Sequence, residues 1–393
     1  MPETCDVAII GGGVIGCAAA RALAARGRTV LIVDAADRLG SGASSAAMGG
    51  ILTQTEPSCL GPLSTVIKRS RDLYLGWLDE LTSVSGVEVP VLQGGDIQVA
   101  LDETEMRRLE EEVLPRWAGS PFEVVRLSAA DARELEPMLS EAVAGGFLLP
   151  EELALDPMLL MEALTTALKA GDLPIRVRTG APAARVTSTP GGAEVHLRDG
   201  ERVTADVVVV AAGHRSPALL PGHRAHLFPI KGEAFDTRPP GARCYPLRHH
   251  VFTEYRDGGF EAFPYLVPRH DGRVAMGVTY EPYVSDTTAT AAAREQIMRG
   301  VAALMPAAAT WPVVRHWAGL RPGSTDHLPI IGHVDDHARV LAATGHSGLG
   351  ITLAPATAEL VAALITGDIT PELRPLLAIC RPDREFVPAS AAA

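Results

Sequence analysis

Three glycines near the start of the chain have the spacing of a turn that binds phosphate groups. The run "IIGGGVIG" places Gly11, Gly13 and Gly16 between a short β-branched stretch, Asp6–Ile10, and an Ala- and Leu-rich stretch that ends at Gly27. In such a turn one glycine permits a sharp bend, one lets the backbone approach a pyrophosphate, and one allows close helix–strand packing. The amides and dipole of the following helix favour the negative charge of the phosphates.

A carboxylate completes this unit. The next β-branched run, Thr29–Asp34, ends on an acid that can accept hydrogen bonds from the ribose hydroxyls of an adenosine. Because the glycines and the acid fall within one strand–helix–strand unit of about 30 residues, they indicate a dinucleotide site rather than an ordinary glycine-rich turn.

The dinucleotide is expected to be FAD rather than NAD. The glycine turn lies at the very N-terminus, a small-residue loop at Gly40–Gly50 can wrap a long cofactor, and a later strand, Arg202–Gly213, ends in Ala-Ala-Gly as if it closed a second layer nearby. The chain has neither a second G-x-G-x-x-G for NAD(P)H nor a C-x4-C redox pair. These features argue against a reductase that depends on a pyridine nucleotide.

Arg321 is the second residue whose surroundings suggest chemistry. It lies in "HWAGLRPGSTDHLPIIG" (His316–Gly332), with no acidic residue within four positions, between an aromatic and apolar lead-in and a predicted Gly/Pro loop. A guanidinium is always charged and can bind a carboxylate through two parallel hydrogen bonds. We therefore expect Arg321 to face an anion, with a salt bridge to an acid distant in sequence as the alternative.

Composition excludes several other classes of protein. The chain has 393 residues and a formal net charge of −12, without a basic stripe, which argues against nucleic-acid binding. Five scattered cysteines are typical of buried reduced thiols, not of disulfides or a zinc site. With no signal peptide and no apolar run of membrane-spanning length, we expect no membrane span and a cytoplasmic protein.

The remaining segments predict an α/β protein, α+β overall. Helical spacing follows residues 64–84, 102–117, 127–139, 156–171 and 354–367, whereas residues 228–278 alternate as antiparallel strands with turns at "RDGG" and "HDGR". We expect a Rossmann-like FAD-binding domain, discontinuous in sequence, with an inserted antiparallel-sheet substrate domain. The predicted limits are 1–83, 150–226 and 322–393 for the FAD-binding domain, and 84–149 and 227–321 for the substrate-binding domain.

The motifs together resemble the D-amino-acid-oxidase-like FAD amine oxidases. The resemblance covers nearly the whole chain through "IIGGGVIG", "SSAAMGG", "PIKGE", "YLVPR.DGR", "WAGLRPGS.D..P.IG" and "GH...GI.LAPATA". It is nearest to the glycine oxidase and sarcosine oxidase branch, and within that branch to glycine oxidases of the thiamin-pathway type. The last two motifs, at matching separation, are more specific than the glycine turn.

The resemblance implies oxidative deamination of a small amino acid or amine such as glycine, sarcosine or a D-amino acid. FAD takes a hydride from the α-carbon, the imine hydrolyses to a 2-oxo acid and ammonia, and dioxygen reoxidises the flavin to give hydrogen peroxide. The alternatives are a dehydrogenase that passes electrons to a quinone or carrier protein, and a flavin-binding subunit without activity. Relatives are commonly oligomers, so we expect a homo-oligomer, a dimer or tetramer.

The resemblance also assigns residues. Arg321 grips the substrate carboxylate, Tyr265 adds a hydroxyl to it or covers the substrate, and Gly348 adjoins it. No general base is required if the amine binds neutral. With the glycine turn and the later strand, the resemblance gives a cofactor set of Gly11, Gly13, Val14, Ile15, Gly16, Asp34, Ala35, Ala43, Ser44, Met48, Gly49, Gly50, Val186, Gly213, His346, Ser347, Gly348, Leu349, Gly350, Ile351 and Thr352. No cysteine lies near the relevant loops in the sequence, so non-covalent FAD is expected.

Two departures from the family pattern affect the substrate. Gly348 stands where glycine oxidases of this type commonly carry an arginine that also reaches the substrate, and Arg248–Pro264 is longer than expected, which predicts an extra hairpin near the pocket mouth. Paired histidines such as His249 and His250 are more often surface residues than pocket residues. Lys231 in "PIKGE" is expected to be structural rather than to assist oxygen activation.

Overall fold

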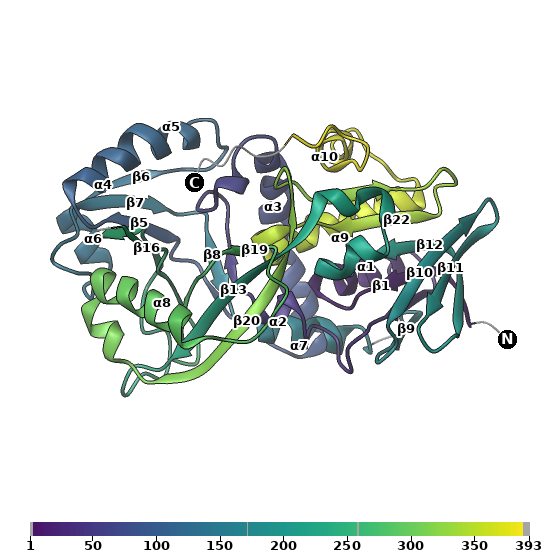
Figure 1. Ribbon diagram of the computed structural model, residues 1–393, viewed down its shortest axis with the longest axis horizontal. Helices are drawn as coiled ribbons and strands as arrows, with labels where there is room; N and C mark the ends of the chain where they lie inside the picture. Colours follow the sequence, from purple (N-terminus) through teal and green to yellow (C-terminus); the bar gives the residue numbers. More distant parts are fainter. Residues whose placement is uncertain (1–2, 171, 258, 388–393) are drawn as a thin grey trace.

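The computed structural model describes residues 3–170, 172–257 and 259–387. Two large β-sheets lie side by side along the long axis of the molecule, and a small sheet joins them (Figure 1). The small sheet contains β3 (Gly50–Ile51), β8 (Leu153–Leu155) and β4 (Val91–Leu92). This arrangement confirms the predicted mixed α/β fold, with a parallel cofactor-binding sheet and a separate, mostly antiparallel sheet.

The first sheet is built around parallel strands rich in valine and isoleucine. Their order is β9 (Ile175–Arg178), β2 (Val30–Val33), β1 (Glu3–Ile10), β12 (Arg202–Val210) and β22 (Val340–Thr344). Antiparallel strands β10 (Ala183–Thr189), β11 (Gly192–Leu197) and β21 (Ile330–His333) extend it. Because these strands come from three distant parts of the chain, the domain is discontinuous, as predicted; its exact limits stay predictions.

Helices cover one face of this sheet. They are α1 (Val14–Ala24), α3 (Leu63–Ser85), α7 (Pro157–Ala167) and α9 (Gly350–Thr366). Successive side chains of a strand point to opposite faces, so Val7 and Ile9 of β1 pack with the helices while Ala8 and Ile10 pack into a second apolar cluster. Because Val7 and Ile9 pack against the helices, the end of β1 lies against α1, and the glycine turn that joins them lies at the first turn of α1.

The second sheet is antiparallel apart from one strand pair. Its order is β19 (Glu281–Pro282), β13 (Leu227–Thr237), β18 (Val274–Gly277), β17 (Tyr265–Pro268), β14 (His250–Phe252), β5 (Asp96–Ala100), β7 (Gly145–Leu149) and β6 (Val125–Ser128), with β20 (Val313–Ser324) also paired to β13. The parallel pair is β14 with β5. Helix α8 (Ala291–Leu304) packs its apolar side chains onto this sheet.

One sequence prediction about the Arg321 segment is wrong. The residues after Arg321 were expected to form a Gly/Pro loop, but Pro322–Ser324 continue β20, which pairs with β13 from Leu227↔Ser324 to Thr237↔Val313. The ladder crosses the middle of the molecule (Figure 1). Proline is tolerated because it lies near the end of a strand at the edge of the sheet. Arg321 therefore projects from a rigid strand.

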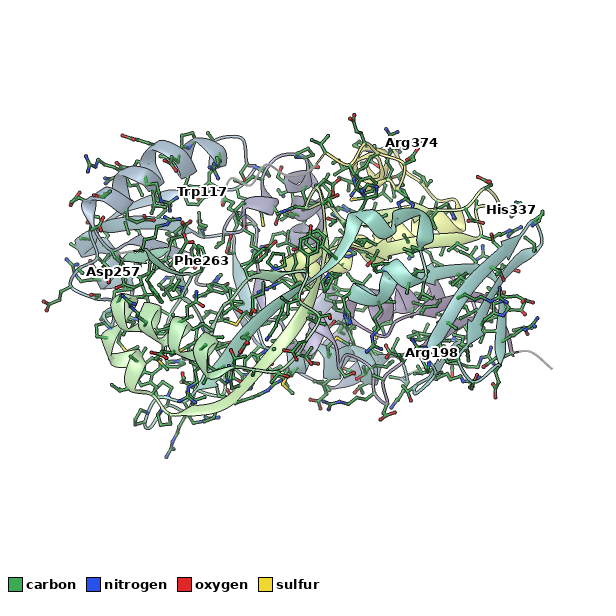
Figure 2. All side chains as sticks on the ribbon, viewed as in Figure 1. Trp117, Arg198, Asp257, Phe263, His337 and Arg374 are labelled. Carbon is green, nitrogen blue, oxygen red and sulfur yellow. The ribbon has the colours of Figure 1, made fainter. Side chains whose placement is uncertain are left out.

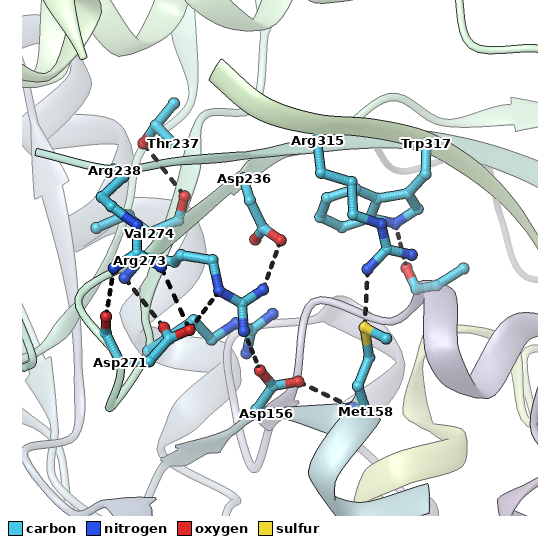
Figure 3. Close-up of polar contacts among 12 residues, drawn as sticks. Asp156, Met158, Asp236, Thr237, Arg238, Asp271, Arg273, Val274, Arg315 and Trp317 are labelled. Carbon is cyan, nitrogen blue, oxygen red and sulfur yellow. Dashed lines mark hydrogen bonds and ion pairs between the residues drawn. The ribbon is translucent and has the colours of Figure 1, made fainter. Parts of the chain in front are cut away.

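An ion-pair network fastens the two halves together. Arg273 of the β17–β18 turn contacts Asp236 on β13 at 2.8 Å and Asp156 at 2.7 Å (Figure 3). Asp156 is also the N-cap of α7, where it accepts from the amide of Met158. Since the carboxylates of Asp156 and Asp236 are almost fully buried, the guanidinium is their main compensating charge.

The long segment before Tyr265 does not form a hairpin at the pocket mouth. Its hairpin, β15 (Tyr255–Asp257) with β16 (Phe260–Ala262), contacts α8 through the Asp257–Arg299 ion pair. Asp257 lies at the outer end of the second sheet (Figure 2). The predicted hairpin is present, but its predicted place is wrong, because it forms a separate two-stranded sheet that packs against α8.

The cysteines and the most apolar helix behave largely as core residues. Cys17, Cys59 and Cys380 are buried free thiols, Cys5 is half-buried, and Cys244 is exposed, contrary to the expectation that all are buried. In the described part of the chain, Ser347–Thr366 alone is long and apolar enough to cross a membrane. Most of that segment is buried inside the protein, as befits the core helix α9.

Candidate active site

The glycine turn has the tight geometry that its spacing predicts. Gly11 has a φ of 110°, and a Cβ there would overlap the carbonyl of Ala211. A Cβ on Gly16 would overlap the carbonyl of Gly11, so α1 can approach β1 only because position 16 is glycine. At Gly13 a Cβ would meet only Ser44 Oγ, at 3.1 Å. The backbone at Gly13 is therefore open to a bound group.

Asp34 and Ser44 bind this turn from two sides. Asp34 accepts from the amide of Gly12 at 2.5 Å through Oδ2 and from Ala36 at 2.7 Å through Oδ1. The Ser44 hydroxyl, on the short helix α2 (Ala43–Ala46), accepts from the amide of Val14 at 2.9 Å. The small-residue loop thus lies directly against the start of α1.

The start of α9 meets the same region. The hydroxyl of Thr352, in its first turn, accepts from the amide of Leu52 at 2.9 Å, just beyond the small-residue loop. His346 Nε2 lies 3.0 Å from Thr357 Oγ1, and burial lowers the pKa of His346 to about 3, so its ring is neutral. This hydrogen bond holds the loop Ser347–Leu349 against the helix that follows.

The structure brings most of the predicted cofactor residues together. The glycine turn with Val14, Ile15 and Asp34, the loop with Ala43, Ser44, Met48, Gly49 and Gly50, and the start of α9 are linked by the bonds above. Gly213 joins them less directly, through a 3.4 Å bond from the hydroxyl of Thr344 to its carbonyl. Val186 lies on β10, beyond β11 from β12. Among the described residues no hydrogen bond links Val186 to the glycine turn, so its role stays a prediction.

These residues fit a bound FAD. The N-cap residues of α1 and α9, Gly13 and Leu349, supply no capping side chain, and Ser44 occupies only the amide of Val14. The next amides of each first turn suit a phosphate or the negative end of a flavin. The glycines at 11, 13 and 16 supply the close backbone approach that a pyrophosphate needs.

Arg321 lies beside this region on β20. Its guanidinium covers Gly232 of the neighbouring strand so closely that a Cβ there would overlap it, and Nη1 donates to the carbonyl of Thr279 at 3.3 Å. Within the described ranges it forms no ion pair within 4.0 Å. Burial lowers the pKa of Arg321, while the charge of Glu56 and then Tyr280 act in the opposite sense. A half-buried guanidinium without a bound anion suits a substrate carboxylate.

Glu56 is an important residue that the sequence analysis missed. Its carboxylate is near enough to Arg321 for their charges to interact, and a Cβ on Gly348 would overlap its Oε1. The hydroxyl of Ser58 donates to it at 3.2 Å. Burial raises the pKa of Glu56, and Arg321 opposes that rise. The only sequence signal was its position shortly after the small-residue loop.

Tyr265 is placed by a residue that the sequence analysis expected at the surface. The phenol oxygen of Tyr265 lies 2.7 Å from Nδ1 of His250 and packs on Gly50, where a Cβ would lie 2.5 Å away. His250 is fully buried, and His249 is buried with Nδ1 3.0 Å from Glu136. The surface prediction for both histidines is therefore wrong. Burial raises the pKa of Tyr265 well above its usual value, so the phenol is neutral.

Lys231 has its own partners. Its ammonium group lies 3.1 Å from Glu233 and 3.4 Å from Asp286, and the side chain is almost completely buried. Glu233 also accepts from the amide of Thr290 at 2.6 Å. These contacts give Lys231 a structural position inside β13, where it is paired with β19 on one side and β20 on the other, although they do not test a role toward oxygen.

Comparisons with known proteins agree with this geometry. The family described as "DAO: FAD dependent oxidoreductase" matches residues 6–364. A glycine oxidase of Geobacillus kaustophilus is 32% identical over 93% of this chain and 94% of its own length, and one of Bacillus licheniformis is 28% identical over 94% and 95%. The crystal structure of the Geobacillus kaustophilus glycine oxidase superposes with a TM-score of 0.85 at 30% identity, covering 95% of this chain and 98% of that one.

Proposed function

Because the chain belongs to the DAO family of FAD-dependent oxidoreductases, as a glycine oxidase-like member, we propose that it oxidises a small amino acid or amine of the glycine, sarcosine or D-amino acid type. The products would be an imine, which hydrolyses to a 2-oxo acid and ammonia, and hydrogen peroxide. When bound, FAD accepts the hydride that leaves the α-carbon and returns the electrons to dioxygen.

The observation that carries this proposal is the position of Arg321. Its guanidinium is held flat against Gly232 on a rigid strand, half-buried, beside the elements that fit FAD, and without an ion pair among the described residues. A bidentate bond to a substrate carboxylate would satisfy this charge. It would also fix the α-carbon in one orientation, which is the main protein contribution to a hydride transfer.

Other side chains would complete the pocket. Tyr265 places a neutral phenol beside Gly50, and Met48 packs on the strand that carries Gly277, where a Cβ would lie 3.0 Å from its sulfur. Glu56 is a charge neighbour of both Tyr265 and Arg321. The proposal therefore places the substrate between Arg321 and Tyr265, with Glu56 beside it.

Glu56 and Gly348 together disfavour substrates that carry a second acidic group. With glycine at 348, no side chain from this position neutralises the Glu56 carboxylate, whose charge weakens the attraction of Arg321 for anions. A second acidic group on the substrate would be repelled. We therefore favour substrates with one carboxylate, and neutral or cationic groups elsewhere.

FAD is proposed to bind without a covalent bond. Two buried thiols lie near the cofactor elements: Cys17 Sγ is 3.3 Å from the carbonyl of Gly12, and Cys59 Sγ is 3.7 Å from that of Leu52. Burial raises the pKa of both thiols far above neutrality, which keeps them protonated and unreactive. The homo-oligomer and the cytoplasmic location stay predictions from the sequence.

The visible spectrum of the purified protein tests the proposal. Anaerobic titration with glycine, sarcosine, D-alanine and D-proline should bleach the flavin band with at least one of them, and air should restore it with formation of hydrogen peroxide. Restoration only by a quinone or carrier protein would make the enzyme a dehydrogenase. A yellow protein that none of these amines bleaches would contradict the proposed function.

A further inference from the structure

A buried chain of polar side chains lies behind Tyr265. His250 and Asp96 are direct neighbours in the register of β14 and β5, with Nδ1 and Oδ1 3.6 Å apart. Thr55 Oγ1 then lies 2.7 Å from Asp96 Oδ2 and 2.6 Å from Glu152 Oε2. His250, Asp96 and Glu152 are fully buried and Thr55 is half-buried, so the three ionisable groups must share their protons with one another and with Thr55.

The Thr55 contacts require one of the two carboxyl groups to be protonated. A hydroxyl donates a single hydrogen bond, yet Thr55 Oγ1 is within bonding distance of two carboxyl groups. Glu152 Oε1 accepts from the amides of Thr53, Gln54 and Thr55 at 2.8–3.1 Å, which favours the ionised form of Glu152. The proton therefore belongs on Asp96, which donates to Thr55 while Thr55 donates to Glu152.

The surroundings of His250 then select its tautomer. Burial lowers the pKa of His250 to about 3, so the ring is neutral and carries one N–H. Within the described structure its Nε2 is buried without a hydrogen-bond partner, as is Asp96 Oδ1. A hydrogen on Nε2 would be a buried donor without an acceptor, which is costly. On Nδ1 the same hydrogen can be donated to Tyr265 Oη, which lies 2.7 Å from the nitrogen. Asp96 Oδ1, 3.6 Å from the same nitrogen, is beyond hydrogen-bond distance.

We propose that His250 is a positioning residue that donates from Nδ1 to the phenol oxygen of Tyr265, and so makes Tyr265 a hydrogen-bond donor to the substrate carboxylate. The phenol has one hydrogen, and with its oxygen accepting from His250 that hydrogen turns toward the pocket. Asp96, held protonated through Thr55 and Glu152, places a neutral carbonyl oxygen 3.6 Å from Nδ1 rather than a competing charge. Tyr265 then assists Arg321 instead of accepting from the amine. This inference rests on the proposed function for the presence of a substrate carboxylate.

The tautomer can be read directly in the wild-type holoenzyme. With ¹⁵N-labelled histidine, the His250 resonances, assigned by their loss in His250→Asn, should show Nδ1 in the protonated and Nε2 in the unprotonated chemical-shift range. The reverse pattern would overturn the inference. The measurement needs neither a substrate nor activity, so it stands even if the proposed function fails.

A double-mutant cycle tests the consequence with acetate as the probe, its binding followed by the change in the flavin spectrum. Tyr265→Phe and His250→Phe should each weaken acetate binding about tenfold, and the double variant should be no weaker than either single one. His250→Asn, which keeps an N–H donor, should recover most of the loss. Additive losses, or no recovery with asparagine, would overturn the positioning role. If acetate does not bind the wild-type protein, the carboxylate site of the proposed function is wrong, and the tautomer alone decides the inference.

Discussion

The Glu56 carboxylate occupies the space in which a side chain at position 348 would begin, since a Cβ on Gly348 would overlap its Oε1. Among neighbouring charges, the same carboxylate has the largest effect on the pKa of Arg321, which it raises. Glycine at position 348 therefore leaves room for the Glu56 carboxylate. The negative charge of Glu56 in turn opposes the binding of a second anionic group beside Arg321.

Replacing that acid should widen the substrate range toward dicarboxylates. Glu56→Gln should improve the ratio of kcat/KM for iminodiacetate over sarcosine about tenfold, because a charge repulsion of on the order of 1–2 kcal/mol is removed. Glu88→Gln makes the same change at an exposed glutamate and should leave the ratio unchanged. An unaltered ratio in Glu56→Gln would show that Glu56 does not sense the substrate's charge.

The charge of Glu56 also predicts a pH dependence of anion binding. Its pKa is raised by burial, so it becomes neutral at a higher pH than an ordinary glutamate as the pH falls. Loss of its negative charge removes the opposition to anions at Arg321. Methanesulfonate, which stays ionised throughout, should therefore bind more tightly as the pH is lowered, and Glu56→Gln should abolish this trend. The same trend in both proteins would assign it to another group.

Gly13 should matter for FAD but not for folding. A Cβ there meets only Ser44 Oγ, at 3.1 Å, so Gly13→Ala should retain the thermal stability of the apoprotein. The methyl group would, however, stand where a pyrophosphate approaches, and should weaken FAD binding roughly 10- to 100-fold, as for overpacking by 1–3 kcal/mol. Gly76→Ala, at an α3 glycine with open space around it and an ordinary φ, should leave FAD affinity unchanged. Full FAD affinity in Gly13→Ala would place the cofactor elsewhere.

The Arg273 network should contribute strongly to stability. Arg273→Met leaves the buried carboxylates of Asp156 and Asp236 without their guanidinium, which should cost about 3 kcal/mol of unfolding free energy. Arg238→Met removes a more exposed arginine, 3.5 Å from Asp271, and should cost at most about 1 kcal/mol. Thermal unfolding of both variants, with FAD bound, makes the comparison. Equal losses of unfolding free energy in the two variants would show that the buried ion pairs contribute no more than the exposed one.

The sequence predicted the parts of the site that are local in the chain. The glycine turn, Asp34 and the start of α9 depend on spacing within short segments, and Arg321 lacked acidic neighbours in its own motif. The family match agrees with the fold and cofactor inferred from these segments.

The site residues that the sequence did not predict are brought together by contacts between strands that are distant in the chain. His250 and Asp96 become neighbours only through the register of a three-residue strand, β14, on β5, and Glu152 reaches them from a third segment. A three-residue strand has no periodic pattern that could reveal it, so the sequence alone predicts a surface position for His249 and His250. Glycine and proline usually end strands, so the sequence predicts a loop after Arg321. In the structure Pro322 and Gly323 instead continue β20 to the end of its ladder with β13.

Whether Arg321 binds the substrate carboxylate can be tested by comparing two amines in the presence and absence of the Arg321 charge. Anaerobic flavin reduction should be followed for the amino acid that bleaches the flavin best and for the matching amine without its carboxylate, in wild type and in Arg321→Met. We expect the wild type to reduce its flavin with the amino acid at least about a hundredfold more efficiently, corresponding to a charge-assisted bidentate bond of roughly 3 kcal/mol. Arg321→Met should lose this preference. A variant that keeps the preference with its FAD in place would contradict the assignment of Arg321 to the substrate carboxylate.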